Sequence, residues 1–67
     1  IGTSSPAAGA ILDITATNKG VLFPRLTTTQ INTIQSPENG LMVYNTTLNT
    51  ICFYNGTSWQ KVSTTNM

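Results

Sequence analysis

The sequence predicts a small, mainly β module that is completed by association with other chains. Runs of β-branched and aromatic residues separated by Asn-Gly pairs indicate short strands and turns. A chain of 67 residues buries only roughly 60% of the surface that its unfolded form exposes, so its own core is marginal. Small domains usually compensate with disulfides, a metal or oligomerisation. Because Cys52 is the single cysteine and the chain has no histidine, we expect no internal disulfide, no metal and no cofactor, which leaves oligomerisation.

The N-terminal part is predicted to hold an extended arm followed by two short apolar segments. Residues 1–9 are small and flexible, which is typical of a linker. Ala10–Ile14 is predicted as a short strand with side chains alternating between two faces. After a turn over residues 17–20, Val21–Phe23 is a second apolar stretch. It must end at Pro24 or lie at a sheet edge, because proline cannot donate a ladder hydrogen bond.

One short helix is predicted from Thr28 to Gln35. The side chains of Thr27 and Gln30 have the spacing of a capping box, in which each satisfies the backbone N–H of the other. Ile31 and Ile34 would then lie on one face and hold the helix by packing, since threonine is a mediocre helix former. The alternative is a polar loop that the two isoleucines anchor.

The C-terminal half is predicted to be a three-stranded antiparallel meander. Its strands are Leu41–Asn45, Thr50–Tyr54 and Thr57–Val62. Residues 46–49 form the first loop, and Asn55-Gly56 is predicted as a two-residue hairpin loop, because both loop residues tolerate positive φ. The expected packing residues of this meander are Leu41, Val43, Ile51, Phe53, Trp59 and Val62.

The charged residues are few: Lys19, Arg25 and Lys61 against Asp13 and Glu38. Such a chain has no basic patch to neutralise phosphates, so we expect no nucleic-acid partner. Its apolar stretches are far shorter than the ~20 residues that cross a bilayer, so we expect no membrane insertion. The two acids sit in dissimilar local contexts and no histidine can act as a base, so the sequence predicts that the chain is not an enzyme.

Three aromatic residues are the candidate site: Tyr54, Trp59 and Tyr44, as ligand or inter-chain contacts. Aromatic faces can stack on sugar rings, which would make them a glycan-binding platform. Aromatic pairs across strands also stabilise a hairpin by packing alone, and we favour this interpretation. Cys52 lies in the middle of a predicted strand without a base to form a thiolate, so we expect it to pack in the core.

Several motifs occur in a familiar order. They are Ala10-Ile-Leu-Asp-Ile14, Asn18-Lys-Gly-Val-Leu-Phe-Pro-Arg-Leu-Thr-Thr-Thr-Gln30, Ser36-Pro-Glu-Asn-Gly-Leu-Met-Val-Tyr-Asn-Thr46 and Phe53-Tyr-Asn-Gly-Thr-Ser-Trp59. Together they resemble a module that recurs in tail-fibre and head-fibre proteins of bacteriophages and in surface proteins of Bacteroidota. Ile31 and Cys52 are unusual choices within that pattern. The resemblance covers most of the chain and implies a homotrimeric module without catalysis; it transfers no site residues.

The leading hypothesis is therefore a structural fibre module that connects or displays other parts of a virion or extracellular assembly. Its expected partners are two further copies of itself and other virion or fibre proteins. The alternative is a carbohydrate- or receptor-binding tip that takes a surface glycan. We expect an arm at residues 1–9, one β-rich module at residues 10–62 and a polar tail at residues 63–67.

Overall fold

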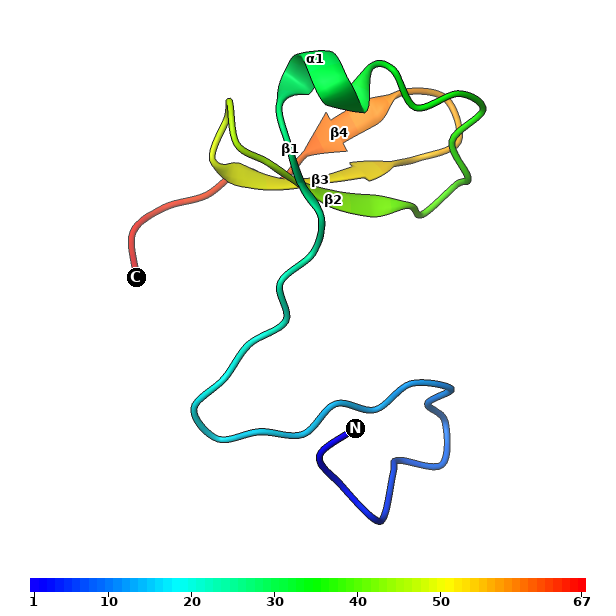
Figure 1. Cartoon of the computed structure of the whole chain (residues 1–67), viewed down its shortest axis with the longest axis vertical. Coiled ribbons are helices and arrows are strands. Elements are labelled where there is room, and N and C mark those ends of the chain that lie inside the picture. Colours follow the sequence, from blue (N-terminus) through cyan, green and yellow to red (C-terminus); the bar gives the residue numbers. More distant parts are fainter.

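The computed structural model describes all 67 residues and contains one mixed sheet of four strands with one short helix (Figure 1). In chain order the elements are β1 (Arg25–Leu26), α1 (Thr28–Ile31), β2 (Met42–Asn45), β3 (Thr50–Tyr54) and β4 (Trp59–Lys61). The strands follow the order β1-β2-β3-β4, with β1 parallel to β2 and the other pairs antiparallel. The predicted mainly β fold with one helix and an antiparallel C-terminal meander is confirmed.

The first hairpin has the predicted loop. Asn45 pairs with Thr50, which leaves residues 46–49 as the connection between β2 and β3. The Asn45 side chain accepts hydrogen bonds from the backbone N–H groups of Thr47 and Leu48, at 2.8 and 2.9 Å. Asn49 closes the turn at φ +55°, a left-handed conformation that asparagine tolerates better than most residues.

The second hairpin differs from the prediction of a two-residue Asn55-Gly56 loop, which is wrong. Tyr54 pairs with Trp59, so four residues connect β3 to β4, and the last strand begins at Trp59. A two-residue type I′ loop needs positive φ at both of its central residues, but here only Gly56 has it, at +94°. The Asn55 side chain instead accepts hydrogen bonds from the Thr57 and Ser58 backbone N–H groups, both at 2.9 Å, which stabilises the longer turn.

The capping box predicted for α1 is present. The Thr27 hydroxyl accepts from the Gln30 backbone N–H at 3.2 Å, and the Gln30 side-chain carbonyl accepts from the Thr27 N–H at 2.9 Å. The helix ends at Ile31, so the predicted extension to Gln35 is wrong. The Thr33 hydroxyl donates to the Gln30 carbonyl at 2.6 Å, and such local side-chain bonds compete with the helical pattern.

Residues 1–24 contain neither helix nor strand and extend away from the sheet (Figure 1), so the extended part is longer than the predicted arm at residues 1–9, and we call all of residues 1–24 the arm from here on. The predicted strands at Ala10–Ile14 and Val21–Phe23 are therefore wrong for the single chain, because no neighbouring strand shares hydrogen bonds with either segment. Of the two alternatives predicted at Pro24, the structure has the first: the apolar stretch ends there without joining the sheet, and the edge strand β1 begins at Arg25. The Pro24 carbonyl accepts from the Tyr44 N–H at 2.9 Å, directly before β1 begins.

The core is small and lies between α1 and the sheet. Ile31, Val43 and Cys52 are each less than 5% exposed, and Leu26 and Trp59 pack against them. The packing predictions are thus confirmed for Val43 and Trp59. The other four expected packing residues, Leu41, Ile51, Phe53 and Val62, are exposed or half-buried and lie outside this cluster.

Candidate functional site

The register of the strands gives the sheet two unlike faces. Residues that pair directly across antiparallel strands point to the same side. Val43 pairs with Cys52 and Asn45 pairs with Thr50, and all four are buried. We call this side, on which α1 packs, the covered face.

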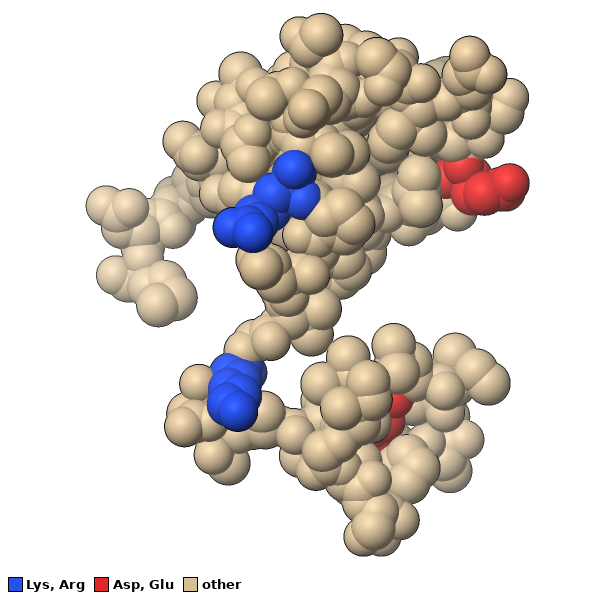
Figure 2. Space-filling view, in the orientation of Figure 1, with Lys and Arg blue, Asp and Glu red and all other residues tan.

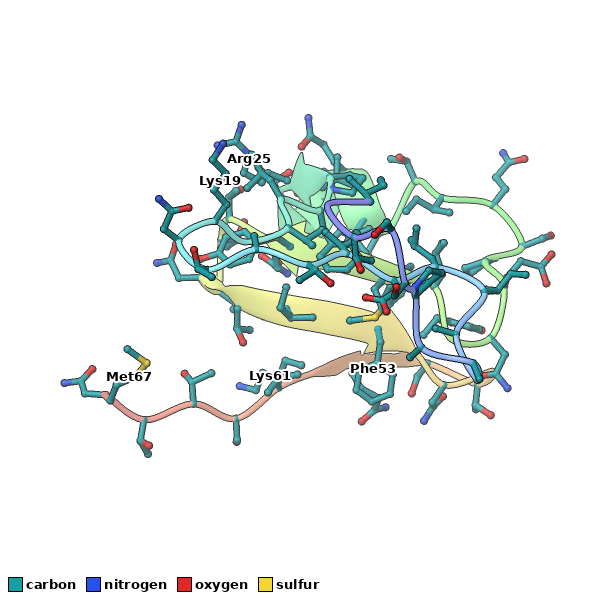
Figure 3. The ribbon with its side chains drawn as sticks, turned by 90° about the horizontal axis from the view of Figure 1, so that it is seen from below. Lys19, Arg25, Phe53, Lys61 and Met67 are labelled. Atoms are coloured by element: carbon teal, nitrogen blue, oxygen red, sulfur yellow. The ribbon has the colours of Figure 1, made fainter.

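The opposite side of the sheet is the open face. It comprises Arg25, Met42, Tyr44, Ile51, Phe53, Gln60 and Val62, which the register places opposite the buried positions. Met42 is 41% exposed, Phe53 36% and Val62 43%, whereas Tyr44 and Ile51 are half-buried. Figure 3 shows Phe53 projecting from the β3 ribbon. Nothing within the chain packs over these side chains as α1 does on the covered face.

The open face carries almost no charge. Arg25 is its single charged residue, at the β1 edge. On the face of the molecule that Figure 2 draws, basic and acidic side chains are likewise isolated on an otherwise uncharged surface. A group of exposed apolar side chains with little charge among them is typical of a surface that another macromolecule covers. The open face is therefore the candidate functional surface of this chain.

On the covered face, the buried side chain of Asn45 holds the helix and the first hairpin loop in place. The Asn45 side-chain amide donates to the Thr28 hydroxyl at 2.9 Å, while its carbonyl holds the loop that follows β2. The Thr47 hydroxyl accepts from the Thr28 N–H at 3.2 Å. This network ties α1 to the β2–β3 hairpin, and no buried side-chain polar atom is left without a hydrogen bond. The helix is thereby fixed over one face and the other is left open.

The three candidate aromatic residues do not converge on one site. Tyr54 and Trp59 pair directly on the covered face, with ring centroids 5.4 Å apart and an interplanar angle of 67°. This edge-to-face geometry is typical of a packing pair. Tyr44 lies on the open face, on the other side of the sheet. Sequence reasoning could not separate them, because the assignment depends on the register of paired strands rather than on local spacing.

A shallow groove of about 530 Å³ lies beside Trp59, between α1 and β4. Ile31 and Asn32 line it from the helix, Cys52 from β3, and Trp59 and Lys61 from β4. We call it the helix-side groove. Sequence reasoning missed it, because the groove exists only where the single helical turn of α1 leaves the β4 side of the covered face unoccupied.

The ionisable and nucleophilic groups are dispersed. The Asp13 carboxylate lies in the arm, where it accepts from the Ala7 backbone N–H at 2.7 Å and the Thr15 hydroxyl at 3.2 Å. Glu38 occupies the connection between α1 and β2, and Cys52 is a free, buried thiol. The structure contains no group of three potential metal-ligating side chains. None of its helices has the length and apolar character needed to cross a bilayer.

Comparison with known proteins gives one match. The family model described as "Phage tail like trimerisation region" matches residues 1–67. No curated protein and no solved structure matches the chain.

Proposed function

The chain belongs to the family of phage tail-like trimerisation regions, and from this premise we propose that it joins three copies of a fibre through the open face of its sheet. The family is a structural one rather than an enzyme family. In the proposed trimer, Met42, Phe53 and Val62 of each copy pack against the neighbouring copies.

The observation that carries the proposal is the imbalance between the two faces. One face has a helix and a hydrogen-bonded asparagine network, whereas the other exposes three large apolar side chains. Moving such a side chain from full exposure to full burial contributes about 1.5–3 kcal/mol, and these three side chains, which are 36–43% exposed, leave a little under half of that gain to the trimer. A closed three-fold arrangement repeats that gain in every copy, which adds to the marginal core of a single small chain.

We propose that this trimer is a connecting element at the surface of a virion or in an extracellular assembly. Residues 10–62 would form the trimerising module, while residues 1–9 and 63–67 lead to neighbouring parts of the fibre. Other fibre or virion proteins are then its further partners. The nearly uncharged surface, rich in Thr, Asn and Ser, supports this setting because it is solvated without attracting charged molecules.

Light scattering on a sizing column, with a dilution series, tests the proposal. The native chain should elute at about 22 kDa, three times its mass of 7.2 kDa. Phe53→Lys places a charge in the proposed seam and should shift the mass toward 7.2 kDa, because an unpaired charge is costly to bury. Val21→Lys is the matched control: Val21 is 55% exposed and lies in the arm, so this variant should remain trimeric.

Two outcomes would contradict the proposal. One is a native chain that stays monomeric at high concentration. The other is a Phe53→Lys variant that forms the trimer as well as Val21→Lys does. Far-UV circular dichroism should show the same sheet signal in both variants, since neither side chain belongs to the core.

A further inference from the structure

We propose that, in the trimer, residues Ala10–Ile14 of one copy add a fifth strand to the outer edge of β4 in a neighbouring copy. This inference rests on the proposed trimer and identifies a second set of contacts that holds it together. The occupant is thus a second copy of this chain, bound through its own arm.

The outer edge of β4 is open to such an addition. The backbone bond from Val62 to Ile51 marks a position at which the two chain segments are hydrogen-bonded, and the bond from Asn55 to Ser58 in the turn continues the same alternation. Because these positions alternate along antiparallel strands, the N–H and C=O groups of Trp59 and Lys61 point away from β3. An edge of this kind is a template for another strand.

The edge at β1 is a poorer template. That strand has two residues and follows Pro24, which has no N–H to donate. The β4 edge has three residues and continues into Val62, which is still in register with β3. Of the two edges of the sheet, β4 therefore offers the longer run of unpaired backbone groups.

The three apolar residues of the segment Ala10–Ile14 lack partners within their own chain. The flanking positions do not, because the Ala10 N–H donates to the Ala7 carbonyl and the Asp13 carbonyl accepts from the Ile1 amino group, a bond that the added strand would have to replace. Ile11 is 106% exposed, Leu12 63% and Ile14 44%. The backbone N–H and C=O groups of these three residues make no hydrogen bond in the chain. Their alternation with Asp13 is a strand pattern, so the segment has the side chains of a strand but no sheet to join.

Charge fixes the register of the added strand. Lys61 is the one charged residue of β4, and Asp13 is the one charged residue of the segment. The Asp13 carboxylate already accepts two hydrogen bonds within the arm, and its two oxygens retain capacity for an ammonium group. We therefore place Asp13 opposite Lys61.

This register determines which face of the neighbouring sheet each side chain of the segment points to. Lys61 pairs with Cys52 and points to the covered face, so Asp13 and Ile11 point there too, toward the helix-side groove. Leu12 and Ile14 then point to the other side and extend the open face beside Val62. The added strand is thus continuous with the proposed trimer seam.

A neighbouring copy, rather than the same chain, is the recipient. The arm leaves the sheet at β1, and β4 is the opposite edge of the same sheet. In Figure 1 the arm runs away from the sheet instead of across it. Residues 15–24 can span about 33 Å when extended, which is ample for reaching an adjacent molecule.

Disulfide trapping in the full chain tests the added strand. In a Cys52→Ala background, Val62→Cys is combined with Leu12→Cys, which faces it in an antiparallel addition, or with Ile14→Cys, which faces it in a parallel one. We expect one of these pairs to give covalently linked dimers and trimers on a non-reducing gel. Ile11→Cys with Val62→Cys is the matched control and should not link, because Ile11 points to the opposite face.

The outcomes separate this inference from the proposed function. A chain that is trimeric by light scattering but forms no intersubunit link with either pair overturns the arm exchange and leaves the trimer standing. A disulfide within one chain, seen as a faster monomer band, also overturns it. A chain that is not trimeric at all contradicts the proposed function first.

A charge swap gives a second test that keeps Cys52. Asp13→Lys should raise the chain concentration at which the trimer half-dissociates by about tenfold, because two like charges then face each other. Adding Lys61→Asp should restore most of that loss. If the double variant is no better than Asp13→Lys alone, Asp13 acts only within its own arm and the register is overturned.

Discussion

The sheet and the arm of this chain both contain apolar residues, but only the sheet, with its helix, buries any of them. All five buried residues lie between Ile31 and Cys52, within the helix and sheet. The arm, residues 1–24, includes isoleucines, leucines and a valine, yet buries none of them. The difference is the presence of a partner strand: each strand of the sheet pairs with another strand of the same chain, and no strand pairs with the arm segments. An apolar pattern therefore indicates that a segment can form a strand, but the strand forms only where another segment is in place to pair with it.

The largest expected effect is in the core. Ile31→Ala should lower the free energy of unfolding by about 2–5 kcal/mol, because it leaves a cavity between α1 and the sheet. Ile31→Val, which removes one methylene, should cost only about 0.5–1.5 kcal/mol. Urea unfolding at one fixed chain concentration measures both. Equal effects of the two changes would mean that Ile31 does not pack as described.

The second largest difference in stability cost is expected between alanine substitutions of an asparagine in the sheet and of one in the arm. Asn45→Ala removes the carbonyl that holds the Thr47 and Leu48 amides, at a cost of about 1–3 kcal/mol. Asn18→Ala in the exposed arm should stay within about 0.5 kcal/mol. The same urea titration compares the two variants. A neutral Asn45→Ala would show that the loop does not need its side chain.

The third comparison is between alanine substitutions of a glycine in the second hairpin and of a glycine in the arm. Gly56 has φ +94°, and an added Cβ would meet the Asn39 side chain at 3.3 Å. Gly56→Ala should therefore cost about 1–2 kcal/mol. Gly9 has no atom within 4 Å of the same position and no positive φ, so Gly9→Ala should be within about 0.5 kcal/mol of neutral. Thermal melts of the two variants should separate by several degrees.

The smallest of these effects is expected at the helix cap. Thr27→Ala removes the hydroxyl that accepts from the Gln30 N–H and should cost about 1 kcal/mol. Thr17→Ala in the arm is the control and should be near neutral, since Thr17 is exposed. Hydrogen exchange at the Gln30 amide gives a local measurement. Unchanged protection there would contradict the role of the cap.

The parts of the fold that sequence could predict are those set by neighbours along the chain. The capping box needs only Thr27 and Gln30, and the turn after Asn45 needs only residues within four positions. The Asn55-Gly56 turn was located correctly but given the wrong length. Its loop length depends on whether Asn55 takes positive φ or uses its side chain to hold the turn, and spacing alone does not decide between them.

The candidate site depended on pairing between strands, and there the prediction was incomplete. Trp59 and Tyr44 are both aromatic residues within predicted strands, so the sequence does not distinguish them. The register places Trp59 against the core and Tyr44 on the open face. Phe53 was expected to pack within the chain and instead projects from the open face. The predicted strand at Ala10–Ile14 failed because a strand requires a partner that its own chain does not supply.

The order of the strands also bears on how the chain would transmit tension. Since β1 is parallel to β2 and the next two turns are hairpins, β1 and β4 run in the same direction. Tension applied to the two ends of the chain would pull β1 toward its N-terminal end and β4 toward its C-terminal end, which are opposite directions along the common strand axis. The sheet would be loaded in shear, so several ladder hydrogen bonds would have to break together rather than one after another. A link in a fibre that is stretched along its length would resist extension best in this geometry.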